Sequence, residues 1–426
     1  MVVSVLARGG CERQLHATTR GLLERGYEIE IFTLAEVPAG ELSLEAEFRK
    51  LGIRITCAGA FGDMSRGNAR DTGLYRLGPF APILPHLDVS RLGWALGQVI
   101  TRFRPGVVHC WSEVSCVIGG FVATALAVPR TILQFVSVPP PRQKPDGSEL
   151  YRKAYRALAR RRNVRMLNIS FANALSFEDW LNLPRGTVGL LRNGFVPDSL
   201  LIRDEQQAKS IRRALGIADG TLTVGSIMRF APEKDPDLWL DTASLIAAAK
   251  PDVHFILAGY GALAGRIEAR IKDMDLSERF TLPGPTTDAG AAYAYMDVFL
   301  MTSKFEGTPN ALVEAQAAGV PVVAPSVGGI EETMRDGLTG VLSAERTAPQ
   351  IAEAVLRILA DPGWRRRAAE NGPRFVAERF DWQRKIDNTI ALYRLDESRL
   401  YRGIERVKAI LGAWRQVGRL QKCGAE

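Results

Sequence analysis

Short apolar segments alternate with helical segments along most of this 426-residue chain, and this alternation limits the possible folds more than any other feature. Seven segments of the first half, rich in valine and isoleucine, are predicted strands: 2–6, 28–34, 53–57, 107–110, 131–136, 166–170 and 187–191. Helical patterns lie between several of them, at 12–25, 90–103, 116–127 and 150–161. Because parallel strands need a long crossover, usually a helix, the alternation predicts βαβ units and a parallel sheet.

The second half of the sequence repeats this alternation. Strands are predicted at 221–227, 253–257, 280–282, 298–301 and 320–324, and helices at 236–249, 262–272, 309–318 and 348–359. A chain of this length exceeds one ordinary core, since a domain usually has about 100–200 residues. We therefore expect two similar α/β domains at 1–200 and 201–381, joined by the polar segment 197–220, and a helical segment at 382–426.

Positive charge is concentrated in two segments. The net charge is +8, yet residues 151–165 hold seven cations and no acid, and residues 399–422 hold seven cations and one acid. Such segments favour an anionic partner, such as nucleic acid, acidic lipid or a phosphorylated substrate. No basic motif with interleaved aromatic residues is present, so we expect no nucleic-acid partner.

Disulfides, metal sites and membrane spans have little support in the sequence. The five cysteines form no C-x-x-C pair, and no two of the four histidines lie three or four residues apart. The longest nearly apolar run, 116–128, is shorter than the roughly 20 residues of a transmembrane helix, and no secretory signal opens the sequence. We expect reduced thiols, no bound metal and a cytoplasmic protein.

A loop and a helix start follow the predicted strand at 298–301. Thr308 is a natural N-cap and Pro309 suits the first helical position, so a helix N-terminus should lie at the carboxyl end of a parallel strand. Such a position attracts phosphate. Glu306 in the loop and Glu314 inside the helix could hold hydroxyls of a sugar and a ribose. The alternative is a capped helix with a solvated Glu314.

Two further loops carry residues suited to a ligand. Arg229 and Lys234 lie five residues apart after a predicted strand, where they could neutralise a departing diphosphate or simply be surface charges. The interpretation as surface charges is less favoured, because this loop and the loop that carries Glu306 both follow strands of one predicted sheet. Gly9 and Gly10 allow close approach of a ligand to the backbone, or form a structural turn.

Taken together, these segments resemble the family-4 glycosyltransferases, which are retaining enzymes of the GT-B fold. Arg229 and Lys234 match the R…K pair of that family, and Glu306 and Glu314 match its E-x7-E motif. The other matching segments are 9–13 (GGCER), 21–29 (GLLERGYEI), 256–261 (ILAGYG), 318–324 (AGVPVVA), 328–332 (GGIEE) and 336–340 (DGLTG). The resemblance covers about residues 2–395 and is strongest in the second domain.

The resemblance implies two Rossmann-like domains that face each other across a cleft, with a C-terminal helix crossing back to the first domain. It also implies catalysis without a metal or other cofactor. Arg229, Lys234 and a helix dipole would stabilise the charge on the departing diphosphate of a nucleotide sugar. Glu306 would face the transferred sugar and complete the catalytic set.

The resemblance implies further contacts around this set. Those to the donor are Glu314 for the ribose, the backbone amides of Gly307, Thr308 and Asn310 for the sugar, and Gly9 and Gly10 for the diphosphate. His109 would lie on the acceptor side, near the sugar. Many family members have H-x-H after this strand, whereas this chain has His109-Cys110-Trp111. A histidine that packs at the strand end is therefore an equal interpretation.

We therefore expect a retaining, hexosyltransferase-like glycosyltransferase. It would move a sugar from a nucleotide-diphosphate sugar to a saccharide or lipid-linked acceptor in the synthesis of cell-surface polysaccharide or glycoconjugate. A nucleotide-sugar epimerase or hydrolase on the same fold is one alternative. A non-catalytic basic scaffold associated with the membrane is another.

The C-terminal residues carry an amphipathic pattern. Apolar residues recur at helical spacing at positions 400, 404, 407, 411, 414 and 417, and cations occupy the remaining face. A basic amphipathic helix suits an anionic membrane surface, which would place the enzyme on the inner face of the cytoplasmic membrane. The other interpretation is a helix that packs on the first domain.

Overall fold

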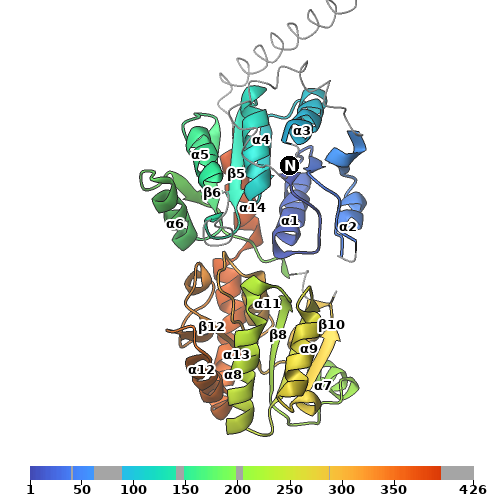
Figure 1. The fold of residues 1–426 in the computed structure, drawn as a ribbon, viewed down its shortest axis with the longest axis vertical. Coiled ribbons are helices and arrows are strands. Elements are labelled where there is room, and N and C mark those ends of the chain that lie inside the picture. The colour runs from blue at the N-terminus through green and yellow to red at the C-terminus, as the bar shows by residue number, and fades with distance from the viewer. Residues whose placement is uncertain (40–41, 62–88, 141–147, 198–204, 287, 395–426) are drawn as a thin grey trace, which may run out of the picture. The chain divides into compact units, whose positions relative to one another are not determined.

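The computed structural model describes residues 1–39, 42–61, 89–140, 148–197, 205–286 and 288–394. These residues form two compact units (Figure 1). Among the described residues, the first unit contains those of 1–169, 173–191 and 386–394, and the second contains 170–172 and those of 192–385. The chain thus passes between the units after residues 169, 172, 191 and 385, whereas the sequence led us to expect boundaries after 200 and 381.

The first unit is built on a parallel sheet of seven strands in the order β3-β2-β1-β4-β5-β6-β7. The strands are β1 (Val2–Val3), β2 (Glu30–Thr33), β3 (Arg54–Cys57), β4 (Val107–Trp111), β5 (Arg130–Phe135), β6 (Val164–Asn168) and β7 (Val188–Leu190). Its helices are α1 (Gly10–Glu24), α2 (Glu45–Lys50), α3 (Val89–Phe103), α4 (Glu113–Ala125), α5 (Ser148–Ala159) and most of α6 (Phe171–Leu181). The predicted parallel sheet of the first half is therefore confirmed.

The second unit contains a parallel sheet of six strands in the order β10-β9-β8-β11-β12-β13. They are β8 (Thr223–Arg229), β9 (His254–Tyr260), β10 (Phe280–Gly284), β11 (Val298–Leu300), β12 (Val322–Pro325) and β13 (Gly340–Ser343). The helices are α7 (Glu205–Ala214), α8 (Pro236–Ala249), α9 (Ala264–Asp273), α10 (Ala289–Ala294), α11 (Asn310–Ala317), α12 (Ala348–Ala360) and α13 (Pro362–Arg379). A last helix, α14 (Trp382–Tyr393), begins in the second unit and ends in the first.

Both faces of the second sheet are buried, which explains the continuous apolar runs of its strands. On β11, Val298 and Leu300 join a core with residues of α8 and α12, whereas Phe299 joins a core with residues of α11 and α13. Successive side chains of a strand point to opposite faces, so one strand supplies both cores. Fully burying a side chain such as Phe299 stabilises the fold by roughly 1.5–3 kcal/mol.

The strand order places the candidate site at a defined point of this sheet. From β8 the chain continues to β9 on one side, whereas β11 continues to β12 on the other. The sheet therefore has a topological switch point between the neighbouring strands β8 and β11, and ligands of open α/β sheets bind beside such points. The loops that carry Lys234 and Glu306 follow these two strands.

The sequence prediction missed five elements, for physical reasons. Helices α2 and α10 have six residues each, too few to show a helical period, and β13 has four residues and begins with glycine. Helix α13 contains Pro373 and two glycines, which obscure its pattern, and α6 has only a weak apolar stripe. The predicted helix beyond residue 394 lies outside the described residues. Among the helices that are described, none is long and apolar enough to span a membrane.

Candidate active site

Lys234 and Glu306 meet at the switch point of the second sheet. Lys234 lies in the short 3-10 helix Pro232–Lys234 after β8, and its Nζ donates a hydrogen bond of 2.5 Å to Oε1 of Glu306. The side chain of Lys234 is 25% exposed and that of Glu306 is 10% exposed. Because the pair is partly shielded from water, its attraction is stronger than that of a surface ion pair.

The backbone of the loop that carries Glu306 packs closely against two glycines, Gly328 and Gly329. The amide of Gly329 donates to the carbonyl oxygen of Glu306 at 3.2 Å. Gly328 has a φ of +56°, and a Cβ atom at this residue would lie 2.2 Å from the same oxygen. A Cβ at Gly329 would lie 2.1 Å from the carbonyl oxygen of Gly307. Only glycines allow this approach, so segment 328–332 fixes the backbone that carries Glu306.

Arg229 is the last residue of β8 and lies in a more exposed position than Lys234. Its side chain is 59% exposed, and Nη2 donates to Oε1 of Glu233 at 2.5 Å. Burial tends to raise the pKa of Glu233, but a backbone hydrogen bond, Arg229 and Lys234 outweigh it and leave this pKa lowered. The two cations therefore have different acidic partners in the structure, Glu233 for Arg229 and Glu306 for Lys234.

Glu314 is buried within α11, so the alternative of a solvated Glu314 is wrong. The hydroxyl of Tyr293 lies within hydrogen-bond distance of two acceptors, Oε2 of Glu314 at 3.1 Å and the carbonyl oxygen of Ala311 at 3.2 Å. Tyr293 itself is fully buried in the apolar core of this face. A buried carboxylate with a hydroxyl donor holds a fixed orientation, because its rotation would break that hydrogen bond.

The start of α11 differs from the sequence prediction. The helix begins at Asn310, and its N-cap is Pro309, which makes no side-chain capping bond, so the predicted cap at Thr308 is wrong. Pro309 has a φ of −68° and an extended ψ of 112°, so it lies outside the helix and takes the N-cap position itself.

Asn193, which the sequence analysis did not single out, holds this segment. Its Nδ2 lies 3.3 Å from the carbonyl oxygen of Thr308 and 3.1 Å from Oδ1 of Asn310. Asn193 is buried in the loop after β7, and it belongs to the second unit. Asn193 and Thr308 are 115 residues apart, so nothing in the local sequence around Asn193 indicated this contact.

Gly9, Gly10 and His109 belong to the first unit. Gly9 is the N-cap of α1, which begins at Gly10, and a Cβ at Gly9 would lie 2.4 Å from Oε2 of Glu12. Both glycines follow β1, and His109 lies within the adjacent β4.

His109 is buried, and both of its ring nitrogens have hydrogen-bond partners. Nε2 lies 2.8 Å from Oε1 of Gln134, and Nδ1 lies 2.6 Å from the hydroxyl of Tyr393 on α14. Oε1 of Gln134 can only accept, so Nε2 carries the ring proton and Nδ1 accepts from the hydroxyl of Tyr393, whose pKa is raised by burial. The ring also stacks on Trp111 with centroids 5.0 Å apart. In this conformation His109 links the sheet to α14.

Metal ligands do not cluster in the described part of the chain: no group of three or more His, Cys, Asp or Glu side chains there could hold an ion. At the carboxyl ends of β8 and β11 the structure joins Lys234 to Glu306, whereas Arg229 pairs with Glu233 and Glu314 with Tyr293. An ammonium group and a carboxylate held this close can bind a phosphate oxygen and a hydroxyl, respectively.

Residues 207–375 match the family model described as glycosyl transferases group 1. This range contains Arg229, Lys234, Glu306 and Glu314. The chain is 29% identical over 307 residues to the Vi polysaccharide biosynthesis protein VipC/TviE of Salmonella typhi, which covers 70% of this chain and 50% of that protein. It is 34% identical over 193 residues to a D-inositol 3-phosphate glycosyltransferase of Geodermatophilus obscurus, covering 43% and 42% respectively. The chain thus spans half or less of the length of these two relatives.

Solved structures show the same architecture over nearly the whole chain. Anabaena Alr3699/HepE in complex with UDP and glucose has a TM-score of 0.74 at 18% identity, covering 92% of this chain and 98% of that one. WaaG, a glycosyltransferase involved in lipopolysaccharide biosynthesis, has a TM-score of 0.68 at 15% identity, covering 92% and 99%. The fold is that of the GT-B glycosyltransferases, two α/β domains each with a parallel sheet, as the resemblance implied.

Proposed function

We propose that this chain is a retaining glycosyltransferase that transfers a sugar from a nucleotide-diphosphate sugar to a saccharide or lipid-linked acceptor. The observation that carries the proposal is the Lys234–Glu306 pair at the switch point of the second sheet. The match of residues 207–375 to the group 1 glycosyl transferases supports it. So do the UDP and glucose bound to Alr3699/HepE, a protein of the same fold.

In the proposed reaction the bond between the anomeric carbon of the sugar and the diphosphate oxygen breaks, and a bond forms from that carbon to a hydroxyl oxygen of the acceptor. The hydroxyl proton passes to the departing phosphate, on which negative charge develops. Lys234 and Arg229 stabilise that charge, and the positive end of α11 adds to their effect. The ammonium of Lys234 has three N–H donors, so it can bind the diphosphate and keep its hydrogen bond to Oε1 of Glu306, while the other oxygen of Glu306 accepts from a hydroxyl of the sugar. Glu314 would meet the ribose, and the amides of Gly307, Thr308 and Asn310 would face the sugar. No metal or other cofactor takes part.

The first unit would supply the acceptor side of the reaction. Gly9 and Gly10 follow β1 at the switch point of its sheet, where they would meet the diphosphate. The assignment of the acceptor to cell-surface saccharides draws support from the relative named for Vi polysaccharide biosynthesis and from WaaG.

Contact with an anionic membrane on the cytoplasmic side is the remaining part of the proposal. Its support is the basic amphipathic pattern after residue 394, which lies outside the described residues. Deleting residues 396–426 should weaken flotation with anionic liposomes. Unchanged flotation would contradict this part, and lost turnover of a soluble acceptor would favour a helix packed on the first unit.

The transferase proposal is tested with Glu306→Gln and Lys234→Ala. A donor is first found by thermal shift with a panel of nucleotide sugars, since a bound ligand raises stability by RT ln(1 + [L]/Kd). We expect each variant to lose about 10²–10³-fold in turnover while its unfolding transition persists. Glu268→Gln and Lys272→Ala, at exposed positions of α9, are the matched controls.

Two outcomes would contradict the proposal. Full turnover by Glu306→Gln or Lys234→Ala would show that the site is wrongly placed. Release of nucleotide at an equal rate with and without saccharide acceptors would favour a hydrolase on the same fold.

A further inference from the structure

Asp235 follows Lys234 directly and has an unusual backbone conformation. Its φ of 52° and ψ of 63° are left-handed, a region that residues other than glycine seldom occupy. The carboxylate makes no capping bond to α8, the helix that begins at the next residue. Something outside the local sequence must therefore hold this conformation, and it sets the direction in which the chain leaves Lys234.

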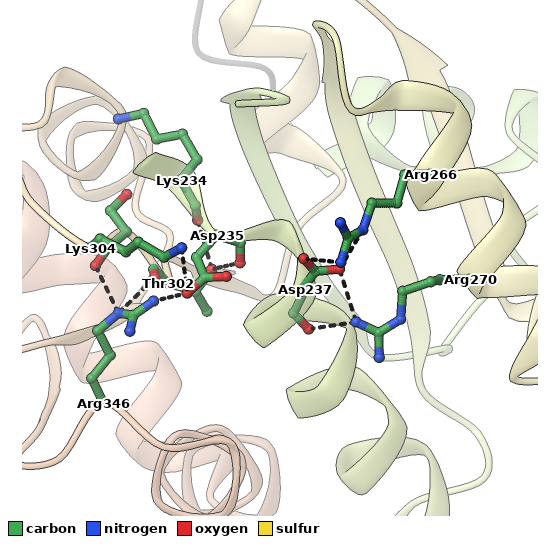
Figure 2. A network of polar contacts seen from close by, with 9 residues as sticks. Lys234, Asp235, Asp237, Arg266, Arg270, Thr302, Lys304 and Arg346 are labelled. Carbon is green, nitrogen blue, oxygen red and sulfur yellow. Dashed lines mark hydrogen bonds and ion pairs between the residues drawn. The ribbon is translucent and has the colours of Figure 1, made fainter. Parts of the chain in front are cut away.

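The carboxylate of Asp235 is held by a cation that is distant in sequence. Its Oδ2 accepts a hydrogen bond from Nη2 of Arg346, and Nζ of Lys304 lies 3.8 Å from the same oxygen (Figure 2). The side chain of Asp235 is only 14% exposed. A buried carboxylate needs such partners, because removing one of them would leave its charge poorly solvated.

Arg346 also contacts the loop after β11. Its Nε lies 3.3 Å from the carbonyl oxygens of both Thr302 and Ser303. The hydroxyl of Thr302 in turn lies 3.1 Å from the carbonyl oxygens of both Lys234 and Asp235, within hydrogen-bond distance of each. Arg346 follows β13 and precedes α12. One guanidinium therefore joins the Lys234 loop to the chain that leads into Glu306.

We propose that the Asp235–Arg346 pair is a positioning element that holds Lys234 against Glu306, so that Arg346 acts on the diphosphate only through Lys234. The proposal rests on the proposed function, because the effect on ligand binding presupposes a diphosphate at Lys234. The fixed fork of arginine suits this role, since it can bind one carboxylate and two carbonyl oxygens at once.

A second charge network in the same view supplies a matched control. Asp237, two residues further on, accepts from Arg270 at 3.0 Å and pairs with Arg266 at 2.9 Å (Figure 2). Arg270 also donates to Asp241 at 2.7 Å. These residues join the neighbouring helices α8 and α9. If breaking any arginine–aspartate pair were enough to weaken nucleotide binding, Arg270→Ala would weaken it as well.

The test measures the affinity of the whole protein for UDP, GDP and ADP by calorimetry. We expect Arg346→Ala to weaken binding of the preferred nucleotide by about tenfold to a hundredfold, the size of one lost hydrogen bond between Lys234 and a charged ligand. Arg270→Ala should bind like the unchanged protein. In a Lys234→Ala background, Arg346→Ala should cause no further loss. Additive losses, or an equal loss in Arg270→Ala, would overturn the proposal.

A crystal structure of the Arg346→Ala variant separates this proposal from the proposed function. We expect Nζ of Lys234 to leave hydrogen-bond distance of Oε1 of Glu306, and an unchanged contact would overturn the proposal. If the unchanged protein binds none of the three nucleotides, the donor site fails while this structural comparison still decides the positioning role. Should Arg346→Ala not fold, Arg346→Gln, which keeps a donor for the carbonyl oxygens, replaces it in every measurement.

Discussion

Replacing Gly328 by alanine should damage the candidate site without touching any charged group. The added Cβ would lie 2.2 Å from the carbonyl oxygen of Glu306 and 3.2 Å from its carbonyl carbon. Because these are backbone atoms, no side chain can rotate to make room, and the Glu306 loop must move by about 1 Å, a displacement that can cost ~10²-fold in rate. The φ of +56° adds a conformational cost of about 1–2 kcal/mol to the alanine variant.

Gly337→Ala separates the two effects. Gly337 has a φ of +73°, and a Cβ there would have no atom within 4 Å. This variant should therefore lose stability for the backbone conformation alone, about 1–2 kcal/mol in urea unfolding. Turnover of the donor found by thermal shift should fall by ~10²-fold in Gly328→Ala and stay unchanged in Gly337→Ala. Equal turnover in the two variants would refute the idea that Gly328 positions Glu306.

Three further predictions concern charge and burial. Turnover should be the same in EDTA as in Mg²⁺, because Lys234 and Arg229 supply the positive charge; activity that EDTA abolishes and Mg²⁺ restores would contradict this. Tyr293→Phe should lower the free energy of unfolding by about 1.5–3 kcal/mol in urea, because Glu314 loses a buried hydroxyl donor. Burial, with Arg279 and Arg212, lowers the pKa of His254 below 6.5. The unfolded chain therefore takes up a proton at His254 more readily than the folded chain, so the free energy of unfolding should fall as pH drops below 6.5. In urea unfolding at pH 7.5 and 5.5, His254→Gln should make this fall smaller.

The sequence predicted the sheets well because their signals are local. The apolar run Val298-Phe299-Leu300 and the proline that opens α8 each mark an element by themselves, and the structure has both. The order of the strands and the switch point depend on which strands pair, and single-sequence periodicity does not contain that information.

The residues that hold the candidate site in place could not be predicted from the sequence either, because their contacts are also long-range. Asp235 and Arg346 are 111 residues apart, and Asn193 and Asn310 are 117 apart. Asp235, Arg346 and Asn193 look like ordinary polar residues in loops, and only the folded chain brings each of them to its partner. The cap predicted at Thr308 was wrong because proline fixes only φ, and the extended ψ of Pro309, 112°, makes Pro309 the N-cap and not the first helical residue.

The four passages of the chain between its units have a practical consequence for anyone who wishes to cut the protein in two. Residues 170–172 belong to the second unit although residues 173–191 of the first unit separate them from residue 192. The amide of Ala172 donates to Oε1 of Glu332 at 2.9 Å. A recombinant fragment that starts at residue 192 would lack this hydrogen bond. A single protease cleavage would likewise leave the units covalently joined at another crossing. Exchange of domains with related enzymes should therefore carry the 170–172 segment along with residues 192–385, as a two-piece graft.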